Sequence, residues 1–131
     1  MSANRRFATS GSPFEGSIGF SRAVREGNWV SVSGTAPIGE GGKTVGAGDP
    51  EAQTKYCFEL IGQALEKVGA SLADVVRTRV FLTHIQRDWQ GAAKAHGEVF
   101  KDIRPASSFI GCAALINDDW LVEIEADALC G

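Results

Sequence analysis

Residues 104 to 128, RPASSFIGCAALINDDWLVEIEADA, decide the fold because they predict two strands joined by a polar turn. In the second strand Glu123, Glu125 and Asp127 recur at a spacing of two residues. Successive side chains of a strand point to opposite faces of its sheet, so the three carboxylates share one face. Either basic side chains face these acids, or at least one acid takes part in chemistry. The other face is apolar and consists of Val122, Ile124, Ala126 and Ala128.

The rest of the chain alternates strand and helix signals. Aromatic and β-branched runs on either side of Glu26-Gly27-Asn28 predict a hairpin, and two apolar stripes at helical spacing predict two helices. Residues 1–16, which contain two glycines and a proline, are expected to form an irregular lead-in. The remaining expected elements are strands over 20–25 and 29–35, a glycine-rich loop over 37–50 with a short strand near 43–45, a helix from 50 to about 68, a strand over 75–83 and a helix over 88–101.

This order predicts one α/β (α+β) domain over residues 1–131, a single mixed sheet with two helices packed on one face. Two helices leave the other face of the sheet uncovered, and that face would carry the acids together with Arg77, Arg79 and Phe81. Copies of the same chain would cover it, so we expect an oligomer with ligand sites between subunits. Arg79 either pairs with Glu125 or Asp127, or recognises a substrate.

Composition excludes several classes of function. With a net charge of −3 and a pI of about 5.3, the chain lacks the clustered basic residues that general nucleic-acid binding requires. No apolar run reaches the ~20 residues of a membrane span, and no apolar segment follows the N-terminal arginines, so we expect neither a membrane anchor nor a signal peptide. Three cysteines in apolar surroundings are typical of reduced thiols, which favours a cytoplasmic location.

Few motifs carry recognisable chemistry. The two histidines, His84 and His96, have no ligand spacing, so we expect no metal, and no nucleotide or cofactor fingerprint is present. His96 lies on the apolar stripe of the second helix, which favours a hydrogen-bonded core histidine over a general base. Ser33-Gly34-Thr35 ends a strand with two hydroxyls around a bare backbone, which is either a cradle for a carbonyl or carboxylate or a simple strand end.

Taken together, the segments FSRAVREGNWVSVSGTAPI, AQT, GASLADVV, RPASS and LVEIEADA resemble the Rid family, also called the YjgF family, over residues 19–128. The resemblance implies a homotrimer with a chorismate-mutase-like fold, whose sheets form a central barrel with small-molecule clefts between subunits. It also implies, for the best-studied branch, hydrolysis of reactive enamines and imines to a 2-keto acid and ammonia, without a cofactor.

Carried over residue by residue, the resemblance makes Glu123 the catalytic residue that positions water. Ser33 and Gly34 would line the cleft, with Phe20 in place of the usual tyrosine.

The arginine that grips the substrate carboxylate in that branch corresponds to Ser107. A serine offers one neutral donor where arginine offers two charge-assisted hydrogen bonds. We therefore expect the chain to be inefficient on 2-imino acids, or its substrate-binding cation to have moved to Arg79 or Arg104.

Two readings of the function remain from the sequence. One is a hydrolase or deaminase of the Rid type that acts on C–N bonds of a small carbonyl- or carboxylate-bearing metabolite. The other is a non-catalytic metabolite-binding or holdase-like protein on the same scaffold. A ribonuclease, an activity sometimes attached to the family name, is the weakest reading because the chain is acidic and has no pair of catalytic histidines.

Overall fold

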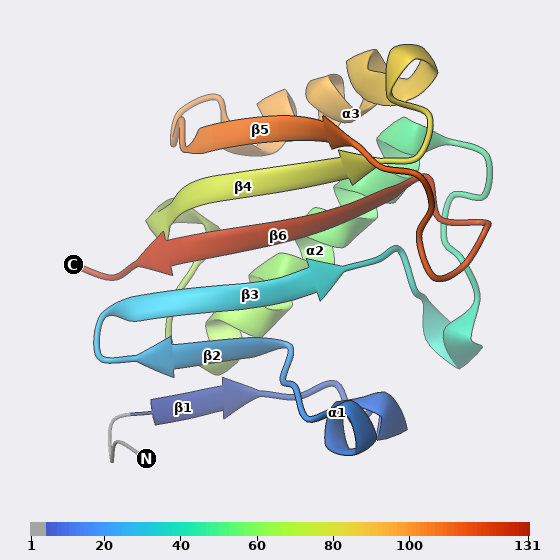
Figure 1. Cartoon of the computed structure of the whole chain (residues 1–131). Helices are drawn as coiled ribbons and strands as arrows, with labels where there is room; N and C mark the ends of the chain where they lie inside the picture. The colour runs from blue at the N-terminus through green and yellow to red at the C-terminus, as the bar shows by residue number, and fades with distance from the viewer. Residues whose placement is uncertain (1–4) are drawn as a thin grey trace.

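The strand that carries the three acids, β6 (Val122–Leu129), lies inside a six-stranded sheet of order β1-β2-β3-β6-β4-β5 (Figure 1). The computed structural model describes residues 5–131. The β4–β5 pair is parallel and the other pairs are antiparallel. The other strands are β1 (Arg5–Ala8), β2 (Ala23–Glu26), β3 (Trp29–Thr35), β4 (Val75–Leu82) and β5 (Ala106–Gly111).

Two long helices, α2 (Pro50–Lys67) and α3 (Ile85–Phe100), lie behind the sheet as it is drawn in Figure 1. The prediction of a mixed sheet with two helices on one face is therefore confirmed. Asp49 caps α2 by accepting a hydrogen bond from the backbone N–H of Ala52, as its position before Pro50 indicates. Within residues 5–131, no helix combines the length and the apolar character that crossing a membrane requires.

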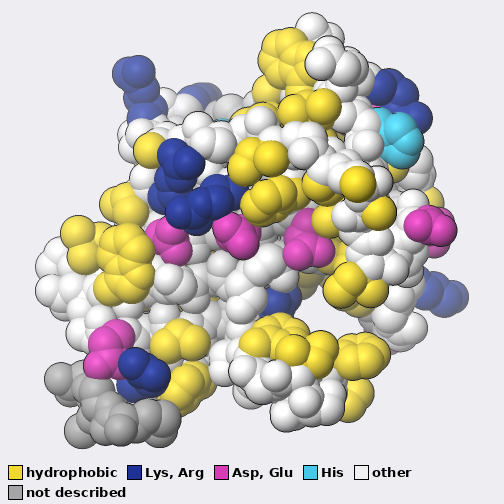
Figure 2. Space-filling view, in the orientation of Figure 1, with side chains coloured by type: hydrophobic (Ala, Val, Ile, Leu, Met, Phe, Trp, Pro, Cys, Tyr) yellow, Lys and Arg dark blue, Asp and Glu magenta, His cyan; other side chains and the backbone are white. Residues whose placement is uncertain are grey.

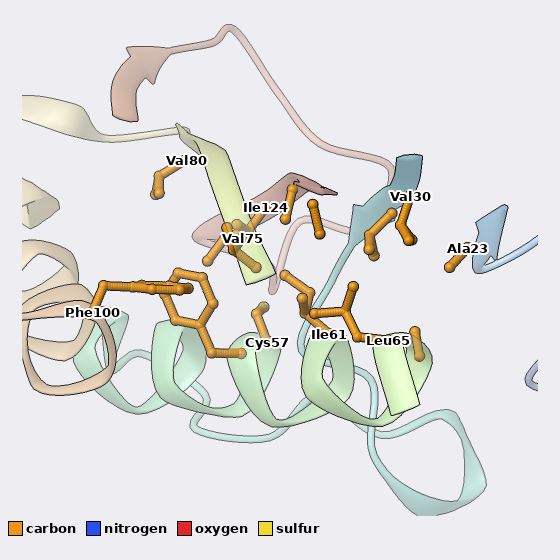
Figure 3. Packing of buried hydrophobic residues seen from close by; sticks show 14 of the residues in the cluster. Ala23, Val30, Cys57, Ile61, Leu65, Val75, Val80, Phe100 and Ile124 are labelled. Atoms are coloured by element: carbon orange, nitrogen blue, oxygen red, sulfur yellow. The ribbon is translucent and has the colours of Figure 1, made fainter. Parts of the chain in front are cut away.

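The core fills the space between α2 and the sheet (Figure 3). Burial alternates along β6, with Val122, Ile124, Ala126 and Ala128 fully buried against the helices and the three acids on the opposite face. An apolar strand face removes its surface from water by packing on a helix, and this burial is the main stabilising contribution to the fold. The predicted separation of the two faces is confirmed.

The prediction of an irregular lead-in over residues 1–16 is wrong for residues 5–16. Residues 1–4 lie outside the part of the chain that the structure describes. Arg5–Ala8 pairs with β2 as the edge strand β1, and Pro13–Ile18 forms the short helix α1. Glu15 holds this segment together because its buried carboxylate accepts hydrogen bonds from the hydroxyls of Thr9 and Ser10. Such short elements depend on tertiary contacts, which sequence periodicity does not report.

Other boundaries shift by a few residues. The strand expected over 20–25 begins only at Ala23, and residues 43–45 contribute a single bridge, Ile38 to Thr44, instead of a strand. The helix α3 begins three residues earlier than expected. Its buried side chains include Asp88 and Ala92, whereas the neighbouring Trp89 is 44% exposed.

Candidate functional site

Glu123 lies on the face of the sheet that no helix covers, next to Gly34 of β3. A Cβ atom at position 34 would lie 2.3 Å from Glu123 Oε2, so only glycine permits this approach. The carboxylate is half-buried and makes no hydrogen bond or ion pair to any residue among 5–131. Burial raises the pKa of Glu123; the Arg22 guanidinium acts in the opposite direction, and the Glu125 carboxylate adds to the rise. A carboxyl group in this state suits proton transfer or the orientation of water.

Arg22, which immediately precedes β2, brings a positive charge to the same place. Its Nη2 donates a hydrogen bond of 2.9 Å to the carbonyl oxygen of Gly34, and its guanidinium carbon lies 5.3 Å from the centre of the Phe20 ring. Phe20, Arg22, Gly34 and Glu123 thus form one connected group, which we call the Glu123 site. Of the predicted residues, Gly34 lies beside Glu123, and Phe20 joins the group through its contact with Arg22.

The hydroxyl groups on either side of Gly34 serve the backbone. Ser33 Oγ donates to the carbonyl oxygen of Ser21, and Thr35 Oγ1 donates to that of Ser33. Thr35 is buried as well. In this geometry the two side chains shape the end of β3, and the bare backbone of Gly34 is the part of the predicted cradle that faces the acid.

The other two acids of β6 are paired, as the sequence suggested. Arg79 Nη1 lies 3.1 Å from Asp127 Oδ2 and 3.5 Å from Glu125 Oε1. Ser31 Oγ donates a further hydrogen bond to Asp127. Figure 2 shows the row of acidic side chains across this face with basic groups above it. The expected ion pair of Arg79 is confirmed, and its charge is directed to these acids.

Ser107 lies on a different side of the molecule from Glu123. Thr78 Oγ1 donates to Ser107 Oγ at 2.7 Å and lies 2.9 Å from His96 Nε2, which gives a chain of three polar groups. Thr78 is completely buried on the helix-covered face of the sheet. Ser107 therefore points toward α3, and one chain by itself does not bring it to the Glu123 site.

His96 is a hydrogen-bonded core histidine, as its place on the helix indicated. Besides Thr78, it packs against the rings of Phe58, Phe100 and Phe109. Burial lowers the pKa of His96, which keeps the imidazole neutral near pH 7.

Arg104 lines a pocket of about 360 Å³ beside His96, at the end of α3. Its backbone is in the left-handed region (φ 57°), where its N–H donates to the carbonyl oxygen of Phe100 and ends the helix. Lys101 lines the same pocket. The structure thus places Arg104 with His96 and apart from the Glu123 site.

Two residues of these groups, Arg22 and Thr78, were missed by reading the sequence. For Arg22 a signal exists: the hairpin turn at Gly27 sets Ala23 opposite Val32, which puts Arg22 beside Ser33 and Gly34. For Thr78 none exists, because its partners come from β5 and α3 through tertiary packing.

No metal centre is apparent among residues 5–131, where no three His, Cys, Asp or Glu side chains are arranged to hold an ion. The three cysteines are free thiols, and burial raises the pKa of Cys57, which makes it unreactive.

The six-stranded sheet backed by two helices makes this chain a small α+β protein. Proteins of known structure share this fold. The chain belongs to the family described as Endoribonuclease L-PSP, the YjgF or Rid family, whose model matches residues 12–130. The structure of Rv2704 from Mycobacterium tuberculosis, a member of the YjgF/YER057c/UK114 family, matches with a TM-score of 0.85 and 45% identity, over 95% of this chain and 98% of that one.

Two further relatives support the assignment. The uncharacterized protein SCO2049 of Streptomyces coelicolor is 39% identical over 126 residues, 96% of this chain and 92% of its own. A RutC family protein of Pyrococcus abyssi is 35% identical over 109 residues, 83% of this chain and 84% of its own. The family resemblance read from the sequence is confirmed.

Proposed function

We propose that the chain forms a cytoplasmic homotrimer that binds a small carbonyl- or carboxylate-bearing metabolite in clefts between subunits, with Glu123 as the acid, base or water-orienting group. The observation that carries the proposal is the state of Glu123. Its two neighbours on β6 are paired with Arg79, whereas Glu123 is half-buried, has a raised pKa and has no partner among residues 5–131. A half-buried, unpaired carboxylate destabilises the fold, and groups of this kind are concentrated at functional sites.

The uncovered face of the sheet supports the oligomer. Trp29 of β3 and Leu129 of β6, which are register partners on this face, are 45% and 51% exposed. Phe81 of β4 points the same way as Glu123. An apolar surface of this kind, mixed with ion pairs, is typical of a protein interface and is unfavourable in water.

The reaction that fits the site is hydrolysis of an enamine or imine. An enamine first becomes the imine by moving a proton from nitrogen to carbon; water then adds to the C=N carbon, and the resulting carbinolamine releases ammonia and leaves a carbonyl group. Glu123 would accept the proton of the attacking water and return it to the departing nitrogen, roles that a carboxyl group with a raised pKa can serve in turn.

An ammonia-release assay tests this proposal with enamines generated in situ from serine or threonine. We expect Glu123→Gln to lower the rate by about 10² or more. Ser107→Arg should raise it if the cation at that position is all that is missing. Equal, substantial rates in the wild type and Glu123→Gln would refute the role of Glu123, and binding of 2-keto acids without turnover in the wild type or Ser107→Arg would favour the non-catalytic reading.

A further inference from the structure

Arg22 is an arginine with most of its hydrogen-bonding capacity unused. A guanidinium has five N–H donors, and within residues 5–131 the side chain of Arg22 makes one hydrogen bond, from Nη2 to Gly34 O. Its Nε is buried and has no partner among the same residues. The protein encloses this Nε, so the donors that remain for a further partner are those of the two Nη groups.

The position of Arg22 suggests what that partner is. Arg22 and Glu123 both contact Gly34 and interact electrostatically, yet they form no ion pair within 4.0 Å in the part of the chain that the structure describes. The other nearby acid, Glu15, is already bonded to Thr9 and Ser10. A cation and an anion therefore face the same bare backbone with a gap between them, on a face that Figure 2 shows to be deeply hollowed below the row of acids.

Other cations of this region are committed elsewhere. Arg79 pairs with Asp127 and Glu125, and Arg77 donates to Ser108 Oγ at 2.8 Å. Arg104 lies beside His96, away from this site. Arg22 is the cation that electrostatically faces Glu123, and its guanidinium lies over the Phe20 ring, 5.3 Å from the ring centre.

We infer that Arg22 binds the carboxylate of the ligand at the Glu123 site. It would supply the cationic contact that Ser107, a neutral side chain, cannot make. The guanidinium is planar, and with one Nη2 hydrogen bond to Gly34 O and contact with Phe20 it keeps further Nη donors, the groups that bind a carboxylate best. The ligand class is a small monocarboxylate whose reactive carbon lies next to the carboxylate, so that Glu123 reaches that carbon. This inference rests on the proposed function.

Calorimetry with pyruvate and its uncharged analogue pyruvamide tests the inference. The wild type should bind pyruvate about 10- to 100-fold more tightly than pyruvamide, and Arg22→Gln should abolish that preference while it leaves the affinity for pyruvamide unchanged. Arg104→Gln, the matched control, should retain the preference. The Nε–H resonance of Arg22 in the wild type gives a second readout that does not depend on a variant: it should shift with pyruvate and stay in place with pyruvamide.

The outcomes separate the inference from the proposed function. If Arg22→Gln keeps the preference for pyruvate, or if Arg104→Gln loses it, the role of Arg22 is refuted and the metabolite site stands. A wild type that binds pyruvamide as tightly as pyruvate, with an unmoved Arg22 resonance, refutes the role in the same way. If the wild type binds neither compound, both the inference and the proposed function fail.

Discussion

Replacing Gly34 with alanine should displace the Glu123 carboxylate and leave the fold intact. The added Cβ would lie 2.3 Å from Glu123 Oε2, whereas ordinary contact begins near 3.4 Å, so the oxygen must retreat by about 1 Å. The three heavy atoms nearest to this Cβ all belong to the flexible Glu123 side chain. Gly34 also has an ordinary φ, so alanine fits the backbone. The free energy of unfolding should therefore change by less than about 1 kcal/mol.

The effect on the site should be much larger than the effect on stability. A carboxylate that moves outward becomes better hydrated, so the pKa of Glu123 should fall toward the ordinary value of a glutamate. NMR titration of the glutamate side-chain carboxyl carbons measures this directly. If the protein releases ammonia from enamines, a displacement of about 1 Å should lower the rate by roughly 10².

Gly97→Ala is the matched control, because a Cβ there meets nothing within 4 Å and the residue lies on the exposed side of α3. This change should stabilise the helix by about 0.5–1 kcal/mol and leave the pKa of Glu123 unchanged. A Gly34→Ala protein with the wild-type pKa of Glu123 and the wild-type rate would refute the placement of Glu123 against Gly34.

Three other predictions follow from single contacts. Gln53 is fully buried and bonds Gly46 O, Asp119 O and Leu121 N, so Gln53→Ala should lower the free energy of unfolding in urea by about 2 kcal/mol, whereas Gln63→Ala on the exposed side of α2 should change it by less than about 0.5. Burial lowers the pKa of His96, which shares a pocket with Lys101 and Arg104, so the folded protein binds this proton less tightly than the unfolded chain does. The free energy of unfolding should therefore decrease as pH falls through about 6.5, and it should decrease less in His96→Gln. Arg79→Ala should lower the free energy of unfolding by up to about 1 kcal/mol if the sheet face stays in water. If that face is an interface, the same change should dissociate the oligomer in sedimentation velocity, and an oligomer that stays intact would contradict a role of the Arg79–Asp127 pair in the interface.

The sequence could predict those elements in which the pattern of polar and apolar side chains indicates which face is buried. In β6 the alternation of acids and apolar residues follows the two faces of the sheet, and in α2 the apolar stripe begins after a capping aspartate. Both patterns arise because each element is half covered. The helix α3 was harder because His84 gives no side-chain cap and Asp88 is buried through a bidentate bond from Arg87, which interrupts the apolar stripe.

The site was predictable only where local geometry or a family motif determines it. Glu123, Gly34 and Phe20 lie in segments that carry the resemblance, and the structure places them together. Arg22 lay within one of those segments, but its importance depends on a missing hydrogen-bond partner, which a sequence does not show. For Ser107, the orientation depends on the parallel pairing of β5 with β4, whose register is fixed by tertiary packing.

The opposite orientations of Ser107 and Glu123 bear on how the binding site is built. Along β4, Thr78 and Phe81 lie on opposite faces of the sheet; Thr78 pairs with Ser107 and Phe81 with Glu123. Within one chain the two side chains are therefore separated by the sheet itself, and no rotamer change brings them together. A cleft that uses both positions must take residue 107 from one copy and Glu123 from another. Arg22 needs no such partner, because it already contacts Gly34 beside Glu123. If Arg22 binds the ligand as inferred above, the cation and the acid for one ligand come from a single subunit, and residue 107 of another copy is not required.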